Sequence, residues 1–164
     1  MSLFRGSVTR QTSEIRPTHR AGTIVLMVAL FMPIAMLSVG MVSDIGLVFI
    51  ARKAVQDACD LGTLAGCQEL DWDLLAEGIV AIKRQAGSAT AIDIAKANLE
   101  NSMGFLKDLR LKAQVTNEVG GEPKIALEAN FTVDTIFLRW LPRYRNGISI
   151  RVYSESSVVE RTQW

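Results

Sequence analysis

The chain has 164 residues, with 18 lysines and arginines against 17 aspartates and glutamates, one histidine, two cysteines and 49% hydrophobic residues. This near-neutral balance excludes a strongly basic nucleic-acid binder and an acidic disordered protein, so no nucleic-acid partner is expected. One histidine and two cysteines are too few for a metal cluster built on repeated Cys and His ligands, so we expect no metal site.

Charge and hydropathy are distributed unevenly along the chain. Residues 1–20 carry four arginines against Glu14, a net charge of +3, and form a basic tail. Residues 21–51 contain a single charged residue, Asp44, and about 20 apolar residues suffice for one transmembrane helix. A secretory signal has an apolar region of only about 7–15 residues, which favours a retained anchor over a cleaved signal. The positive-inside rule places the tail in the cytoplasm and residues 52–164 outside, although the Arg52-Lys53 pair opposes this orientation.

Asp44 is the one charge in the predicted transmembrane helix. At 1.5 Å per residue it lies roughly 33 Å along the axis from Gly22, near the outer headgroup boundary. Two interpretations remain open. The carboxylate either reaches water, or it pairs with an arginine or lysine of a neighbouring subunit and sets the register between the two.

The helix is expected to continue outside the membrane over residues 52–70. Small residues recur there every four positions and therefore share one helix face, which predicts close contact with another helix, either of a second subunit or of the same chain; they are Ala54, Ala58, Gly62 and Gly66. Cys59 and Cys67 are eight residues apart, about 12 Å on an unbroken helix and beyond disulfide reach. An intrachain disulfide would require the helix to turn back, and buried free thiols or an intersubunit disulfide are the alternatives.

Several polar positions in this region follow a recognisable series. The chain reads Arg20-Ala-Gly22, then Asp44-Ile-Gly46, Ala51-Arg52, Val55-Gln56-Asp57-Ala58, Asp60-Leu61 and Leu64-Ala65-Gly66. Over residues 20–66 this resembles the N-terminal segment of TadE/TadG-like proteins of the tight-adherence (Flp) pilus system. The resemblance implies a single-pass protein of the bacterial inner membrane that helps assemble, anchor or cap an adhesive pilus, with Asp44 and Gly46 among its packing residues. Some TadE-like members are cleaved after a glycine and carry Glu at the fifth mature position. Here the fifth residue after Gly22 is Met27, so cleavage is not favoured.

Residues 71–164 are expected to form a small α+β domain. Apolar residues at a helical period predict helices over 72–86 and from about 90 to 103, separated by Gly87 and Ser88. The period then becomes alternating, with strands around 109–115, 125–133 and from 148 to about 159, and a turn over 117–122 that contains Gly120 and Gly121. We expect a three-stranded antiparallel meander with the two helices covering one face.

The loop before the third expected strand interleaves basic and aromatic residues, namely Arg139, Trp140, Arg143, Tyr144 and Arg145. Such a composition suits binding to a nucleic-acid backbone or an anionic surface polysaccharide, although a loop with Trp140 packed on the core edge is favoured. No nucleophile has a recognisable base partner, and the only histidine, His19, lies in the tail, so neither catalysis nor a cofactor is expected.

The favoured function is a non-enzymatic, minor-pilin-like subunit of pilus assembly that packs against other pilin-like subunits in an oligomeric assembly. The alternative is a membrane-anchored module that binds an extracellular polymer through residues 139–145.

Overall fold

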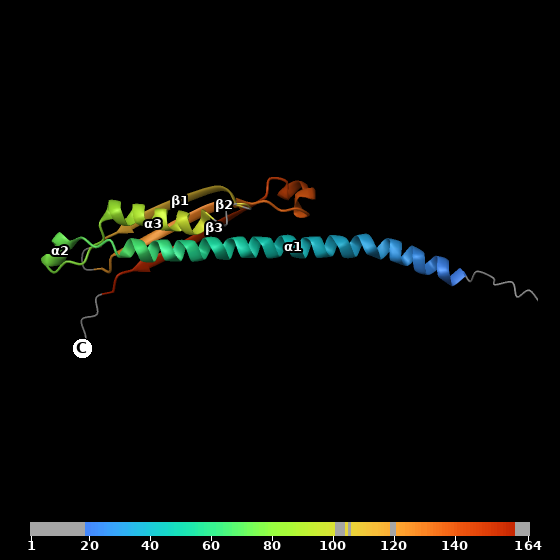
Figure 1. Cartoon of the computed structure of the whole chain (residues 1–164), viewed down its shortest axis with the longest axis horizontal. Coiled ribbons are helices and arrows are strands. Elements are labelled where there is room, and N and C mark those ends of the chain that lie inside the picture. Colours follow the sequence, from blue (N-terminus) through green and yellow to red (C-terminus); the bar gives the residue numbers. More distant parts are fainter. Residues whose placement is uncertain (1–18, 101–103, 105, 119–120, 160–164) are drawn as a thin grey trace, which may run out of the picture. The chain divides into compact units, whose positions relative to one another are not determined.

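The computed structural model of the chain describes residues 19–100, 104, 106–118 and 121–159. The basic tail, apart from its last two residues, lies outside this range, as do the expected helix end at Met103 and the turn residue Gly120. The elements follow one another as shown in Figure 1: α1 (His19–Cys67), α2 (Trp72–Ala76), α3 (Arg84–Leu99), β1 (Leu106–Thr116), β2 (Lys124–Val133), the 3-10 turns η2 (Leu138–Trp140) and η3 (Pro142–Tyr144), and β3 (Ile148–Ser157).

The three strands form an antiparallel meander in the order β1-β2-β3, which confirms the predicted α+β fold. In β2 every second side chain is buried, as expected of a strand whose one face covers a core; the buried residues are Ile125, Leu127, Ala129, Phe131 and Val133. The register of β1 against β2 shifts between Lys107 and Arg110, where Asp108 has a φ of 53°. The first strand therefore begins with a bulge before it enters regular pairing.

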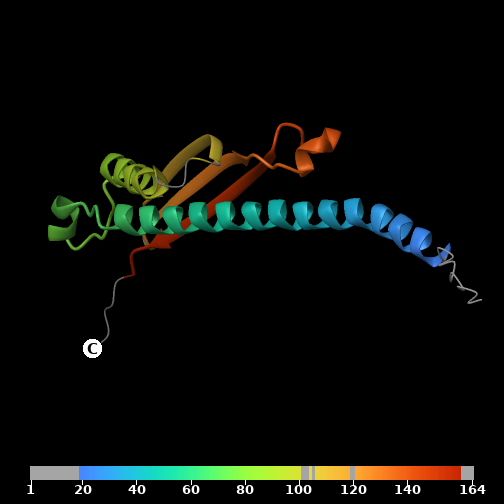
Figure 2. The same ribbon diagram turned by 45° about the vertical axis from the view of Figure 1, so that its right-hand side comes forward.

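The buried face of the sheet is covered by α3 and by the C-terminal part of α1. Ala51, Val55 and Cys59 of α1 belong to the same buried cluster as Leu99 of α3 and Leu127 of β2. Figures 1 and 2 both show these two helices beside the sheet. We predicted that two helices following residue 70 would cover the sheet. This is wrong for the first of them, because α2 buries none of its residues and α1 covers the sheet in its place.

The prediction of one continuous helix over residues 72–86 is also wrong. Asp71 caps α2, which ends after five residues, and Gly78 turns the chain with a φ of 81°. The chain then extends so that Ile82 bridges to Leu70, while the side-chain amide of Asn117 bonds both backbone groups of Ile82. These contacts satisfy the backbone N–H and C=O of Ile82 without a helix, and α3 therefore starts only at Arg84.

The chain divides into two compact units whose boundary lies between Ser38 and Val39. We call the unit from Val39 onward the head. Residues 39–51, assigned to the membrane in the sequence-based division, thus belong to the same compact unit as the sheet. The stretch 52–70, expected as a continuation of the helix, supplies Val55, Ala58 and Cys59 to the head's core.

Candidate functional site

Asp44 anchors a distant loop to α1. Its side chain is only 3% exposed and accepts hydrogen bonds from the backbone N–H groups of Ile136 at 3.0 Å, Phe137 at 2.7 Å and Leu138 at 2.7 Å. Leu138 begins η2, so the carboxylate lies at a helical N-terminus with unpaired donors and satisfies them. The interpretation that Asp44 reaches water is therefore wrong. Pairing with a neighbouring subunit stays a prediction, although both carboxylate oxygens already have partners within the chain.

Gly40 lies one helical turn before Asp44 and contacts the same loop. It is buried, and a Cβ placed on it would lie 2.4 Å from the ring of Phe137. The position therefore requires glycine, because the aromatic ring occupies the space of a side chain. Gly40 and residues 135–138 were not among the candidates drawn from the sequence. No local signal links positions more than 90 residues apart.

The predicted stripe of small residues faces α3 of the same chain over most of its length. A Cβ on Gly62 would lie 2.5 Å from the carbonyl oxygen of Ala91, and one on Gly66 would lie 2.7 Å from that of Gly87. Ala58 is buried beside them. This is the intrachain alternative for the stripe, and it explains why Gly87, expected to separate two helices, lies inside α3. Ala54 and Gly46 remain partly exposed, and nothing lies within 4 Å of a Cβ built on Gly46.

A second polar contact fixes α1 to β3. The hydroxyl of Thr63 is fully buried and lies 3.1 Å from the Ser154 hydroxyl and 2.9 Å from that of Ser156. About two turns before Thr63 on the helix, the side-chain amide of Gln56 donates to the carbonyl of Tyr153. Sequence reasoning missed Thr63, whose only signal is a hydroxyl on an otherwise apolar helix face.

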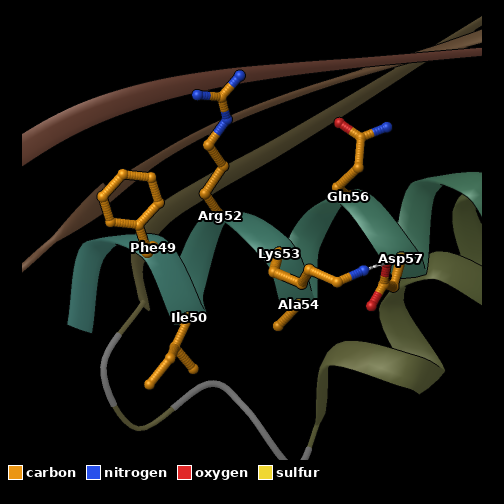
Figure 3. A pocket seen from close by; sticks show the side chains of 7 residues that line it. All are labelled: Phe49, Ile50, Arg52, Lys53, Ala54, Gln56 and Asp57. Atoms are coloured by element: carbon orange, nitrogen blue, oxygen red, sulfur yellow. Dashed lines mark hydrogen bonds and ion pairs between the residues drawn. The ribbon is translucent and has the colours of Figure 1, made fainter. Parts of the chain in front are cut away.

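Another face of α1 within the head has no partner among the described residues. Phe49 and Ile50 are each 66% exposed, and Leu61 and Leu64 are exposed further along the same face. Between them, Lys53 forms an ion pair with Asp57 at 2.7 Å, and this contact raises the pKa of Lys53. Figure 3 shows the shallow hollow formed by this surface, with Lys53 reaching along the helix to Asp57 and with Arg52 and Gln56 projecting toward the strands. We call the surface formed by Phe49, Ile50, Lys53, Asp57, Leu61 and Leu64 the open face of α1.

Residues 136–145, which we call the basic loop, depart from the expected packing. Trp140 is 89% exposed, so the prediction that it packs on the core edge is wrong. Leu138 is buried instead, because the three bonds to Asp44 orient η2 with that side chain inward. Arg139, Arg143 and Arg145 are exposed, Tyr144 is half-buried, and no acidic residue lies within the loop.

Cys59 and Cys67 are both buried free thiols on an α1 that continues unbroken through both positions. Burial raises the pKa of Cys59 to about 11 and also raises that of Cys67, whose Sγ contacts the Ser156 carbonyl at 3.4 Å. A thiol in such surroundings stays protonated and unreactive near neutral pH. The structure therefore gives these cysteines a packing role within the head.

One family of known proteins matches part of the chain. Residues 22–76, about a third of the chain, match the family described as Flp pilus-assembly TadE/G-like. The match confirms the resemblance noted over residues 20–66 and covers nearly all of α1 together with α2. No curated protein and no solved structure matches the chain. The family match and the apolar helix support a membrane-associated component of a Tad-type pilus-assembly system.

Proposed function

We propose that the chain is a structural, non-enzymatic, single-pass membrane subunit of Tad-type pilus assembly, minor-pilin-like in its use of one long helix. The observation that carries this proposal is the coincidence of the family match with α1. The matched segment begins at Gly22, where the exposed apolar part of the helix begins, and continues through the part that builds the head's core. A component that couples a membrane to an assembly outside it needs both parts on one element.

The proposed membrane segment is shorter than the sequence alone indicated. The large apolar side chains between Ile24 and Val39 are exposed, and they belong to the one described helix long and apolar enough to cross a bilayer. From Gly40 onward α1 contacts other elements of the head, beginning with Phe137, so lipid cannot surround it. Residues 22–39 span about 27 Å as a helix, close to the roughly 30 Å hydrocarbon thickness.

The orientation follows from the arginines before the helix. Four arginines lie within residues 1–20, before the apolar segment, and on the other side Arg52 and Lys53 are followed within eight residues by Asp57 and Asp60. The positive-inside rule then places the N-terminal tail in the cytoplasm and the head in the periplasm or beyond. The protein would accordingly present its head to the compartment in which the pilus is built.

The open face of α1 is the proposed contact with other pilin-like subunits. Exposed Phe49, Ile50 and Leu64 lie on one side of the helix, while the opposite side is occupied by the sheet and α3. Aromatic and aliphatic side chains on an unpartnered helix face are suited to packing against another helix. In this arrangement the small residues hold the head together, and the larger exposed residues contact the next subunit.

The test compares substitutions on the open face with deletion of the gene. Deletion should remove surface pili counted by electron microscopy, and the native gene should restore them. Phe49→Asp should leave the protein in the membrane at its normal level but restore few or no pili, because it replaces a large apolar side chain at the subunit contact with a carboxylate that is costly to bury. The matched control is Ile79→Asp, which places the same charge on an exposed position beyond α2 and should restore pili fully. Normal pili in the deletion strain would contradict the assembly role. Normal pili with Phe49→Asp would contradict the assigned contact face.

A further inference from the structure

The basic loop exposes an unusual combination of side chains. Ile136, Trp140 and Leu141 are apolar and exposed, with Trp140 the most exposed large apolar residue described. Three arginines alternate with them and give the loop a net charge of +3. Asp134, which forms an ion pair with Lys107, lines the same surface hollow as Arg139 and Arg145, so three arginines face one nearby carboxylate. Exposed apolar side chains beside this excess of cations indicate a contact surface for something both apolar and anionic.

The loop is held at one particular level of α1. Phe137 packs on Gly40, and the backbone of residues 136–138 is bound by Asp44. Gly40 directly follows the exposed apolar segment that we propose crosses the membrane. The two contacts therefore attach the loop to the first turn of α1 beyond that segment. With the helix leaving the bilayer after Val39, as proposed above, a loop tied there would lie beside the lipid headgroups.

The residue types match the chemistry of that layer. Tryptophan is enriched at membrane interfaces because its ring is apolar and its N–H donates a hydrogen bond. The guanidinium of arginine binds phosphate through paired hydrogen bonds. Isoleucine and leucine side chains are apolar and suit the upper part of the acyl chains. Polysaccharide and nucleic-acid backbones provide anions but no apolar layer for these side chains.

We propose that the basic loop rests in the headgroup layer on the C-terminal side of the membrane crossed by α1. Trp140, Ile136 and Leu141 enter the acyl boundary, and Arg139, Arg143 and Arg145 bind lipid phosphates. This inference rests on the proposed membrane anchor. The loop acts as a second membrane contact that fixes the tilt and rotation of the head, since a helix alone leaves the rotation about its axis free.

Tryptophan fluorescence of the full chain tests the loop's position. The chain is reconstituted in vesicles of phosphatidylcholine and phosphatidylglycerol, with or without brominated acyl chains. One variant keeps only Trp140 (Trp72→Phe, Trp164→Phe), and the matched control keeps only Trp72, which is also exposed but lies on α2 (Trp140→Phe, Trp164→Phe). Brominated lipid should quench Trp140 about twofold or more and leave Trp72 unaffected, while aqueous acrylamide should quench chiefly Trp72.

Replacing the loop arginines tests whether they bind lipid phosphates or only lie near the membrane. Replacing the three loop arginines by glutamine should reduce quenching of Trp140 by brominated lipid at least about twofold, because the phosphate contacts are lost. The matched control makes the same change at three exposed basic residues elsewhere on the head and should leave quenching unchanged; these are Arg84, Lys96 and Lys112.

The contrary outcomes are distinct. Acrylamide quenching of Trp140 equal to that of Trp72, in a chain that resists extraction by carbonate, would overturn the loop contact but keep the membrane anchor. Shielding of Trp140 from both quenchers would overturn it in favour of a protein partner, such as a second copy. A chain extracted by carbonate would overturn the anchor, and the loop contact with it.

Discussion

Replacing Asp44 by alanine should release the basic loop from α1. The change removes the acceptor of three N–H groups, those of Ile136, Phe137 and Leu138. The first two belong to exposed residues and can bond water once the loop moves, whereas Leu138 is buried. Hydrogen bonds to a charged group contribute about 1.5–3 kcal/mol each, and a buried donor left unpaired costs about 1–3 kcal/mol. With partial rehydration of the exposed pair, we expect the loop's attachment to weaken by about 2–4 kcal/mol.

Hydrogen exchange of the backbone amides at residues 136–138 measures this directly. Since a tenfold change in an equilibrium corresponds to about 1.4 kcal/mol, the expected loss is roughly 30- to 1,000-fold faster exchange at these amides in the full chain in lipid nanodiscs. Amides in the centre of β2 should keep their native exchange, because the core of the sheet does not include the loop. Asp44→Asn should fall between native and alanine variants, as its amide keeps one acceptor oxygen but presents N–H groups to a backbone donor.

Asp57→Ala is the matched control. It removes a carboxylate from the same helix, but one whose partner, Lys53, is exposed and outside the loop. Exchange at residues 136–138 should stay native in this variant. If Asp44→Ala altered exchange there less than about threefold, its carboxylate would contribute under 1 kcal/mol and the anchoring role would be refuted.

Two further predictions concern packing within the head. Gly62→Ala should lower the free energy of unfolding in detergent by about 1–2 kcal/mol, because the new Cβ meets the Ala91 carbonyl and overpacking outweighs the helix-propensity gain of about 1 kcal/mol. Gly46→Ala, whose Cβ would meet nothing, is the control, and equal stability of the two variants would contradict the close α1–α3 contact. Cys59 at pH 8 should react with iodoacetamide at least about 100-fold more slowly in the folded than in the denatured chain, because its pKa is raised to about 11 from 9.0. The folded state keeps this proton while the unfolded state loses it, so the stability due to Cys59 is intact below pH 9 and falls as pH rises toward 11; a Cys59→Ala variant that showed the same decline would argue against this assignment.

Alternating hydrophobicity was enough to predict the meander. Leu127, Ala129 and Phe131 lie on one face of β2 as expected, because a period of two leaves no other way to bury them together. The same reasoning failed between Trp72 and Ala86. Apolar residues recur there at a helical period, but Asn117, more than 30 residues away, binds the backbone of Ile82 and keeps it extended. Local periodicity contains no information about such a partner.

The candidate site was predictable in composition but not in geometry. Asp44 and the arginines of the basic loop were both singled out from their sequence context, each with a different partner in view. Their connection depends on the N-terminus of η2, which sequence patterns did not reveal. The prediction that Trp140 is buried was wrong for a related reason. A large apolar residue is usually expected inside, but once Asp44 orients η2, Leu138 points inward and Trp140 points to the surface.

The uninterrupted apolar run over residues 21–51 contains an exposed stretch and a stretch packed against the head, and hydropathy alone cannot distinguish the two. Up to Val39 its large side chains are exposed, as lipid-facing residues must be in a helix that crosses alone. Beyond Gly40 the run stays apolar because Ala51 and its neighbours bury against the sheet, and the one charge it contains accepts hydrogen bonds from backbone N–H groups of the head. Since both stretches belong to the one helix α1, a change in how the head packs on α1 should also change which of its residues are free to meet the proposed membrane. The basic loop sits at that transition, so we expect Gly40, Asp44 and the loop to determine jointly where the membrane-crossing part of the helix ends.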